Sequence, residues 1–171
     1  MTDYLSMDIE SYLFTDASSR DVLDRAKKLL LEAPEKMTMS VMESTFRSAC
    51  ICEMVEVAEW ILSVNPEVMS NLKGGTQKLF REVCLHNDVE IAKLLLNADP
   101  TINISEGGEN LFVNACVNNH LTLAQWTLGV RPDTNIMCIL GWLKQNETSI
   151  EDMPRDEIVE WLKQVKPVTS V

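Results

Sequence analysis

The stretch GENLFVNACVNNHLTLAQWTLGVRPDTNI (residues 108–136) contains two short apolar segments separated by a polar connector. In its first half, Phe112, Ala115 and Cys116 are spaced i, i+3 and i+4, which places them on one face of a helix. The second half, LTLAQWTL, again repeats its apolar residues at helical spacing, and the connector at residues 118–120 is short. Two helices joined by so short a turn are typical of a helical hairpin.

The same pattern recurs along the chain with a period of 32–34 residues. Five sets of residues keep this period: Phe14, Phe46, Phe80 and Phe112; Pro34, Pro66, Pro100 and Pro132, followed by Pro167; Ala17, Ala49, Val83 and Ala115; Ala26, Ala58, Ala92 and Ala124; and Leu30, Leu62, Leu96 and Leu128. Each proline ends the second helix of its repeat, because proline disfavours helical geometry in the residue before it. Self-similarity at this period is typical of helical repeat proteins.

We therefore expect an all-α fold, a single domain over residues 1–171 built as a solenoid of about five stacked helix-turn-helix repeats. The repeats cover approximately residues 9–36, 40–69, 74–103, 108–136 and 137–168. A helix pair of this size cannot bury its apolar face alone, so neighbouring pairs must stack. The first and last repeats are expected to be caps: the first has the polar run Ser18-Ser19-Arg20-Asp21 between its helices, and the last inserts residues 145–153.

The five cysteines indicate neither a disulfide framework nor a zinc site, because their number is odd and no CxxC pair is present. We accordingly expect no metal and no cofactor. Cys50, Cys84 and Cys116 share one position of the repeat with small neighbours, so they are interpreted as small buried hydrophobic residues.

The period and the helix–turn–helix–loop order resemble the ankyrin repeat family. In the fourth repeat Gly108 falls on the turn glycine of the family, His120-Leu121 on its GHL, and Asp133-Thr134-Asn135 on its closing D-V-N. The T-P-L-H signature is absent, and the pattern FxxAC…VAxWL…P is similar to divergent ankyrin repeats of giant DNA viruses. The resemblance implies a viral protein–protein interaction module, and it leaves open whether the β-hairpin fingers of the family are retained.

The charge balance and the N-terminal sequence further limit the possible functions and locations. The net charge of −11 with a pI near 4.6 argues against direct nucleic-acid binding and is compatible with a basic protein partner, although it also serves solubility alone. No apolar run is long enough to cross a membrane, and the acidic N-terminus lacks the pattern of a signal peptide. An intracellular location is expected, in the host cytoplasm or nucleus if the protein is viral, with the virion as an alternative.

No recognisable catalytic arrangement appears in the sequence. Cys84 and His86 are two residues apart on an expected helix and therefore point to different sides, while Cys116 and His120 lie on either side of a turn. Lys73-Gly74-Gly75-Thr76 lacks the frame of a phosphate-binding loop. We expect the protein not to be an enzyme.

The expected binding surface is the exposed end of each first helix. It carries three pairs of residues, each starting with an aliphatic one: Ile51 and Cys52, Leu85 and His86, and Val117 and Asn118. These aliphatic residues either pack between adjacent helices or form an apolar surface for a partner. Should both readings fail, acidic loop tips at Glu106 and Glu109 are the next candidates.

Three tryptophans occupy a matching position on the second helices: Trp60, Trp126 and Trp161. They are interpreted either as partly buried core residues or as a contact between copies of the chain. The second reading leads to an alternative function, that of a self-associating structural or virion-packaged protein.

Overall fold

The computed structural model describes residues 9–104, 111–131, 136, 139, 141 and 156–165, and every described secondary-structure element is helical. The chain divides into two compact units, Met1–Ile102 and Asn103–Val171, which we call unit 1 and unit 2. Within the described ranges, no helix has both the length and the apolar composition needed to span a membrane. The predicted all-α class is confirmed.

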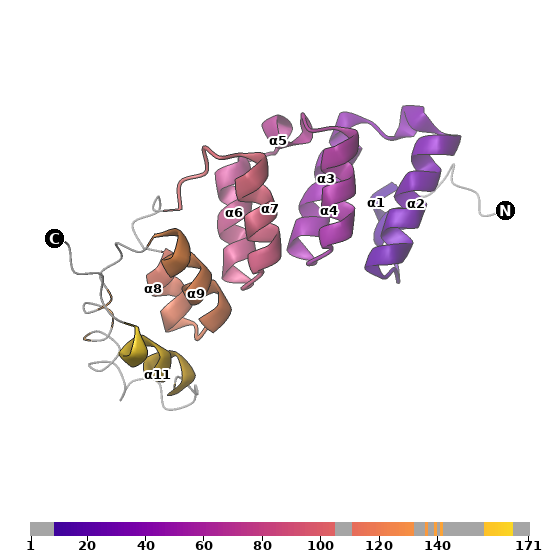
Figure 1. The fold of residues 1–171 in the computed structure, drawn as a ribbon. Coiled ribbons are helices and arrows are strands. Elements are labelled where there is room, and N and C mark those ends of the chain that lie inside the picture. The colour runs from indigo at the N-terminus through magenta and orange to yellow at the C-terminus, as the bar shows by residue number, and fades with distance from the viewer. Residues whose placement is uncertain are drawn as a thin grey trace. The chain divides into compact units, whose positions relative to one another are not determined.

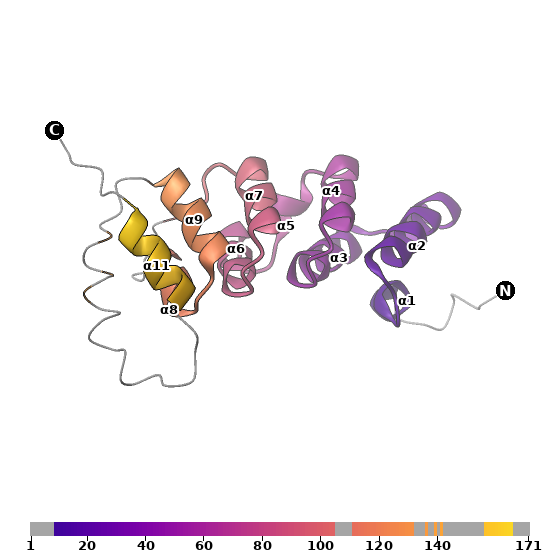
Figure 2. The ribbon, with the colours of Figure 1, turned by 60° about the horizontal axis from the view of Figure 1, so that its bottom comes forward.

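Unit 1 consists of successive helical hairpins with short connectors (Figures 1 and 2). Its elements are α1 (Ile9–Phe14), α2 (Ser19–Glu32), the 3-10 helix η1 (Pro34–Lys36), α3 (Met39–Ile51), α4 (Val55–Val64), α5 (Val68–Asn71), α6 (Thr76–Leu85) and α7 (Val89–Ala98). The hairpins α3–α4 and α6–α7 lie side by side, and α3 also contacts α6.

Unit 2 contains a further hairpin of α8 (Leu111–Val117) and α9 (Leu121–Val130), together with α11 (Asp156–Gln164). Trp161 of α11 packs against Phe112 of α8, with the two rings 6.2 Å apart and tilted by 59°. Most of the fifth predicted repeat, and the loop tips Glu106 and Glu109, lie outside the described residues.

One turn geometry is repeated in all three of the hairpins α3–α4, α6–α7 and α8–α9. The left-handed residue of each turn is Glu53 (φ 59°), Asn87 (φ 63°) and Asn119 (φ 57°), respectively. In each case the next residue donates its backbone N–H to a carbonyl five residues back: Met54 to Ala49 at 2.8 Å, Asp88 to Val83 at 3.4 Å and His120 to Ala115 at 2.8 Å. This hydrogen bond and a left-handed residue together form the Schellman arrangement, which satisfies carbonyls at the end of a helix.

The recurring sequence positions also agree in their burial. Phe46, Phe80 and Phe112 are exposed by 0%, 2% and 1%, so their predicted burial is confirmed. The alanines at the equivalent point of α2, α4, α7 and α9 are fully buried: Ala26, Ala58, Ala92 and Ala124. A small side chain there allows neighbouring helices to approach closely, while the phenylalanines fill the space between them.

The first repeat departs from the predicted register. Ser18 is the N-cap of α2, and Ser19–Asp21 form its first turn, so the polar run does not lie between the helices as predicted. The cause is a capping box: the Asp21 carboxylate accepts the Ser18 backbone N–H at 2.9 Å, and the Ser18 hydroxyl accepts the Asp21 N–H at 3.3 Å. Phe14 is consequently half-buried at the end of α1, and Leu13 is the fully buried residue instead.

A buried carboxylate holds the connector between α5 and α6. Glu43 of α3 is only 8% exposed and accepts the backbone N–H of Lys73 at 2.7 Å. Gly74 and Gly75 follow with φ values of 87° and 79°, which side chains larger than glycine rarely adopt. The segment between α4 and α6 therefore contains one short helix, α5, and a left-handed glycine pair.

Candidate functional site

The exposed end of the first helices in unit 1 is the principal candidate surface. Leu85, the last residue of α6, is 61% exposed, whereas Ile51, the last residue of α3, is half-buried. The adjoining Cys52 and His86 are exposed. α3 and α6 contact each other within unit 1, and of the two aliphatic residues that end these helices only Leu85 is strongly exposed.

An ion pair lies one helical turn before these ends. Arg47 of α3 donates to the carboxylate of Glu82 of α6, and both side chains are partly shielded from water, with 27% and 30% exposure. Arg47 precedes Ile51 by four residues and Glu82 precedes Leu85 by three, so each charge shares a helix face with its aliphatic neighbour. The pair therefore links the two helices one turn before the candidate surface.

The third predicted pair lies in unit 2. Val117 is half-buried at the end of α8, and Asn118 is exposed, with its amide donating to the Asn114 carbonyl at 2.9 Å. The position is equivalent in sequence to Leu85 and His86, but the side chain of Val117 is shorter and less exposed. The structure thus places Ile51 and Leu85 in one unit and Val117 in the other.

The cysteines of the repeat are buried, as predicted from their position. Burial raises the pKa of the Cys84 thiol to about 12, with a further contribution from the Asp88 carboxylate, and raises that of Cys116 to about 12. Burial also raises the pKa of Cys50 strongly. A thiol with a raised pKa is a weak nucleophile, so these side chains contribute to packing.

The tryptophans of the matching position are all half-buried: Trp60 on α4, Trp126 on α9 and Trp161 on α11. Trp161 has a defined neighbour in the Phe112 ring. Half-burial agrees with the first interpretation, partly buried core residues, and leaves part of each residue exposed.

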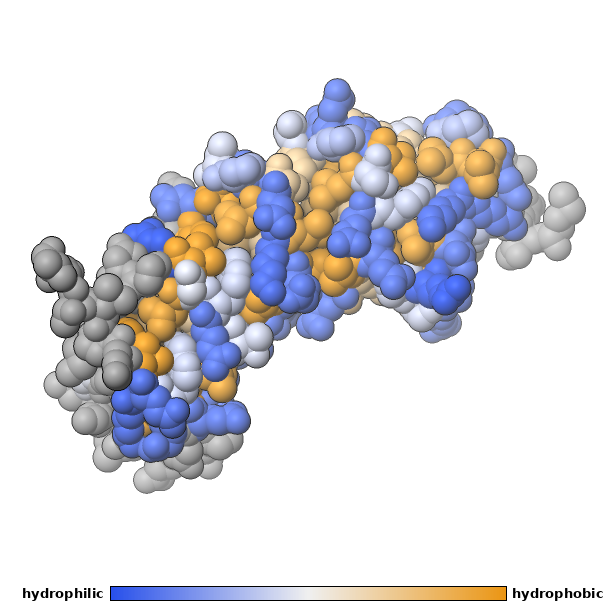
Figure 3. Space-filling model, in the orientation of Figure 1, coloured by the Kyte–Doolittle hydropathy of each residue, from blue (hydrophilic) through white to orange (hydrophobic). Residues whose placement is uncertain are grey.

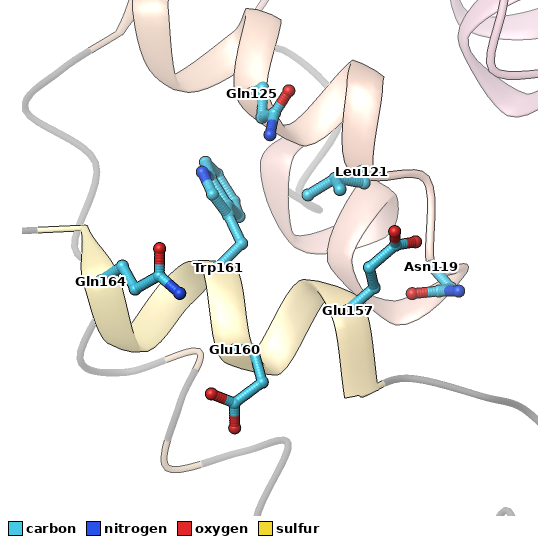
Figure 4. Close-up of a pocket in the computed structure, with 7 residues that line it drawn as sticks. All are labelled: Asn119, Leu121, Gln125, Glu157, Glu160, Trp161 and Gln164. Atoms are coloured by element: carbon cyan, nitrogen blue, oxygen red, sulfur yellow. The ribbon is translucent and has the colours of Figure 1, made fainter.

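A groove in unit 2 was missed by the sequence analysis. It has a volume of about 640 Å³. The α8–α9 turn and α9 contribute the lining residues Asn119, Leu121 and Gln125, and α11 contributes Glu157, Glu160, Trp161 and Gln164. In Figure 4 the indole of Trp161 stands between Gln125 and Gln164, and Glu157 extends toward Asn119 and Leu121. Hydrophilic side chains gather over α11 in Figure 3. The Trp161 position was noted in the sequence, but a long insertion separates it from the lining residues of the α8–α9 turn and α9.

A second hollow, of about 400 Å³, lies in unit 1 beside the α5–α6 connector and includes Thr76 and Asp99. Asp99 accepts the Thr101 hydroxyl at 2.5 Å and the Thr76 hydroxyl at 2.6 Å, and these hydrogen bonds lower the pKa of its carboxyl. Because these groups already satisfy one another, the hollow has a structural role.

The residues considered for catalysis are not arranged as a reactive pair. Cys84 is buried whereas His86 is exposed, and burial of His120 lowers the pKa of its imidazole. In the described parts of the chain, no three His, Cys, Asp or Glu residues are grouped as a metal ion would require. Comparisons with protein-family models, with curated proteins and with solved structures find no match.

Proposed function

We propose that this chain is a non-catalytic protein-interaction module, a solenoid of about five ankyrin-like repeats. The repeated Schellman turns at Glu53, Asn87 and Asn119 support the repeat, as does the equal burial of the phenylalanine positions. The ankyrin fingers have no counterpart in the described connector between α4 and α6, which contains α5 and a glycine pair. The proposed relationship is therefore with a divergent form of the family, of the giant-virus type.

The observation that carries the binding role is the exposure of Leu85. An aliphatic side chain that is 61% exposed stands at the end of a well-packed helix, where a polar residue would be cheaper to solvate. It directly precedes the exposed His86, and one helical turn before it on α6 stands Glu82, which pairs with Arg47 of α3. An apolar side chain rimmed by polar groups is the usual anatomy of a protein-binding surface.

The partner is proposed to be another protein, basic in character, met inside a host cell, since the chain itself carries a net charge of −11. Neither direct nucleic-acid binding nor membrane binding belongs to the proposal. A second candidate function is self-association as a structural or virion protein. The partial exposure of Trp60 and Trp126 favours it.

Capture with matched variants tests the first proposal. Leu85→Asp should remove the specific partner, because a carboxylate in a desolvated interface has no counter-charge. Leu31→Asp is the control, since Leu31 is 84% exposed at the end of α2 and receives the same substitution. Light scattering on the purified protein tests the second candidate: a mass of 19.3 kDa per particle at micromolar concentration rules out stable self-association.

A further inference from the structure

The groove between α9 and α11 combines an indole, amides and two carboxylates, without any lysine or arginine among its lining residues. We infer that it binds the side chain of an arginine in a basic, extended segment of the partner protein. This inference rests on the proposed function and adds to it a second contact site, in unit 2, with a defined chemistry. Its volume of about 640 Å³ lies in the range of ligand-binding clefts.

The negative charge of the groove comes from Glu157. Its side chain is exposed, points toward Asn119 and Leu121 in Figure 4, and has no cation within ion-pair distance among the described residues. Glu160, by contrast, is directed away from α9 and accepts the Lys163 ammonium at 2.5 Å. Among the described residues, a cation entering the groove would therefore meet the Glu157 carboxylate without displacing a cation from it.

The indole of Trp161 supplies the second contact. Its packing against Phe112, at 6.2 Å and 59°, fixes the ring in unit 2, while its half-exposed part lines the groove. A cation over an indole face is attracted by the ring quadrupole, and the planar guanidinium stacks there better than an ammonium does. The amide groups of Gln125 and Gln164, on either side of the ring, can accept the remaining N–H groups.

Charge complementarity selects the occupant. The chain has 26 acidic and 15 basic residues, which attracts basic segments in general, and the groove provides the geometry that distinguishes arginine among them. Bidentate pairing of the guanidinium with Glu157 and stacking on Trp161 both require the planar group. Lysine should therefore bind less tightly, and a neutral side chain of similar length should not bind.

The test is a titration of the full chain with a fluorescein-labelled (Arg-Gly)4 peptide at low salt, followed by anisotropy. We expect saturable binding, at least threefold weaker binding of (Lys-Gly)4, and none of (Gln-Gly)4. Glu157→Gln should weaken (Arg-Gly)4 binding at least fivefold. Glu59→Gln, an equal change of charge at an exposed position of α4 in unit 1, should leave it within twofold. Trp161→Phe should weaken it as well, with a melting scan to show that α11 remains packed.

Equal weakening by Glu157→Gln and Glu59→Gln would overturn the inference, because attraction by the whole chain would then explain the binding. The inference would also be overturned if (Gln-Gly)4 bound with the same affinity as (Arg-Gly)4. The inference can fail separately from the proposed function. If Leu85→Asp abolishes capture of a partner while Glu157→Gln leaves peptide binding unchanged, only the arginine-binding role of the groove is disproved. If Glu157→Gln weakens peptide binding while Leu85→Asp leaves capture intact, the arginine-binding role of the groove is supported and the binding role of the first-helix ends is disproved.

Discussion

Arg47 on α3 forms an ion pair with Glu82 on α6, so a charge in one helical hairpin is neutralised by a charge in the next. The two residues occupy neighbouring first helices 35 positions apart in sequence. Stacking of hairpins thus includes a polar contact at the edge of the buried phenylalanine positions. The same contact adjoins Leu85, on which the proposed binding role rests.

The ion pair should contribute modestly to the stability of unit 1. Partly exposed pairs typically stabilise by about 0.5–1 kcal/mol, because solvent screens them and ordering both side chains costs entropy. Urea unfolding of Arg47→Ala, Glu82→Ala and the double variant gives the coupling free energy directly. A coupling free energy of zero would show that apolar packing alone holds α3 against α6.

Phe80→Ala should destabilise the protein by about 3–5 kcal/mol, since it removes a large side chain that is only 2% exposed. Leu85→Ala, five residues later on the same helix and 61% exposed, is the matched control and should change stability by less than about 0.5 kcal/mol. Chemical denaturation of both variants measures the difference. Similar losses for the two would mean that the buried and exposed faces of α6 are assigned wrongly.

Glu53→Gly should stabilise the α3–α4 hairpin by about 0.5–1 kcal/mol. Glu53 has a φ of 59°, a conformation that costs a residue with a Cβ roughly 1–2 kcal/mol, and the entropy of glycine in the unfolded chain offsets part of the gain. Its neighbour provides the control: Cys52 has a φ of −91°, so Cys52→Gly should not stabilise. A loss of thermal stability in Glu53→Gly would argue against a common turn geometry in the three hairpins.

Native thiol labelling at pH 8 should distinguish Cys52 from the cysteines of the repeat. Cys52 is exposed, whereas burial raises the pKa of Cys84 and Cys116 to about 12. At pH 8 a thiol with that pKa is ionised in roughly one molecule in ten thousand, and burial also blocks the reagent. Mass spectrometry should find Cys52 modified first, and Cys50, Cys84 and Cys116 only after denaturant is added. Rapid modification of these three in the native protein would contradict their burial.

The periodic residues predicted the helices and their buried faces because each repeat places the same side chains in the same environment. The burial of Phe46, Phe80 and Phe112 could be predicted without knowing any distant contact, since local spacing alone assigns these residues to the apolar face of their helices. The start of α2 was predicted wrongly because the Ser18–Asp21 capping box, a local signal, competes with the repeat register. Such a box stabilises a helix start by about 1 kcal/mol, enough to add one turn.

The candidate surfaces were less predictable than the fold. The repeat pattern identified Leu85 as a candidate binding residue at the end of a first helix. Whether its side chain is packed or exposed depends on how closely α3 and α6 approach each other. The groove depends on α11 lying against α9, and a long insertion separates Trp161 from Gln125 in sequence. Contacts of this kind are set by tertiary packing, which leaves no periodic signal.

The measurement that tests the central claim most directly is photo-crosslinking from position 85. Leu85→p-benzoylphenylalanine places a crosslinker at the exposed end of α6, and Leu31→p-benzoylphenylalanine places it at the exposed end of α2 as a control. If the first-helix ends bind a partner protein, irradiation in a cell extract should give a discrete heterologous adduct from position 85 and none from position 31. The same adducts from both positions, or from position 85 only crosslinks between copies of this chain, would contradict the proposed role.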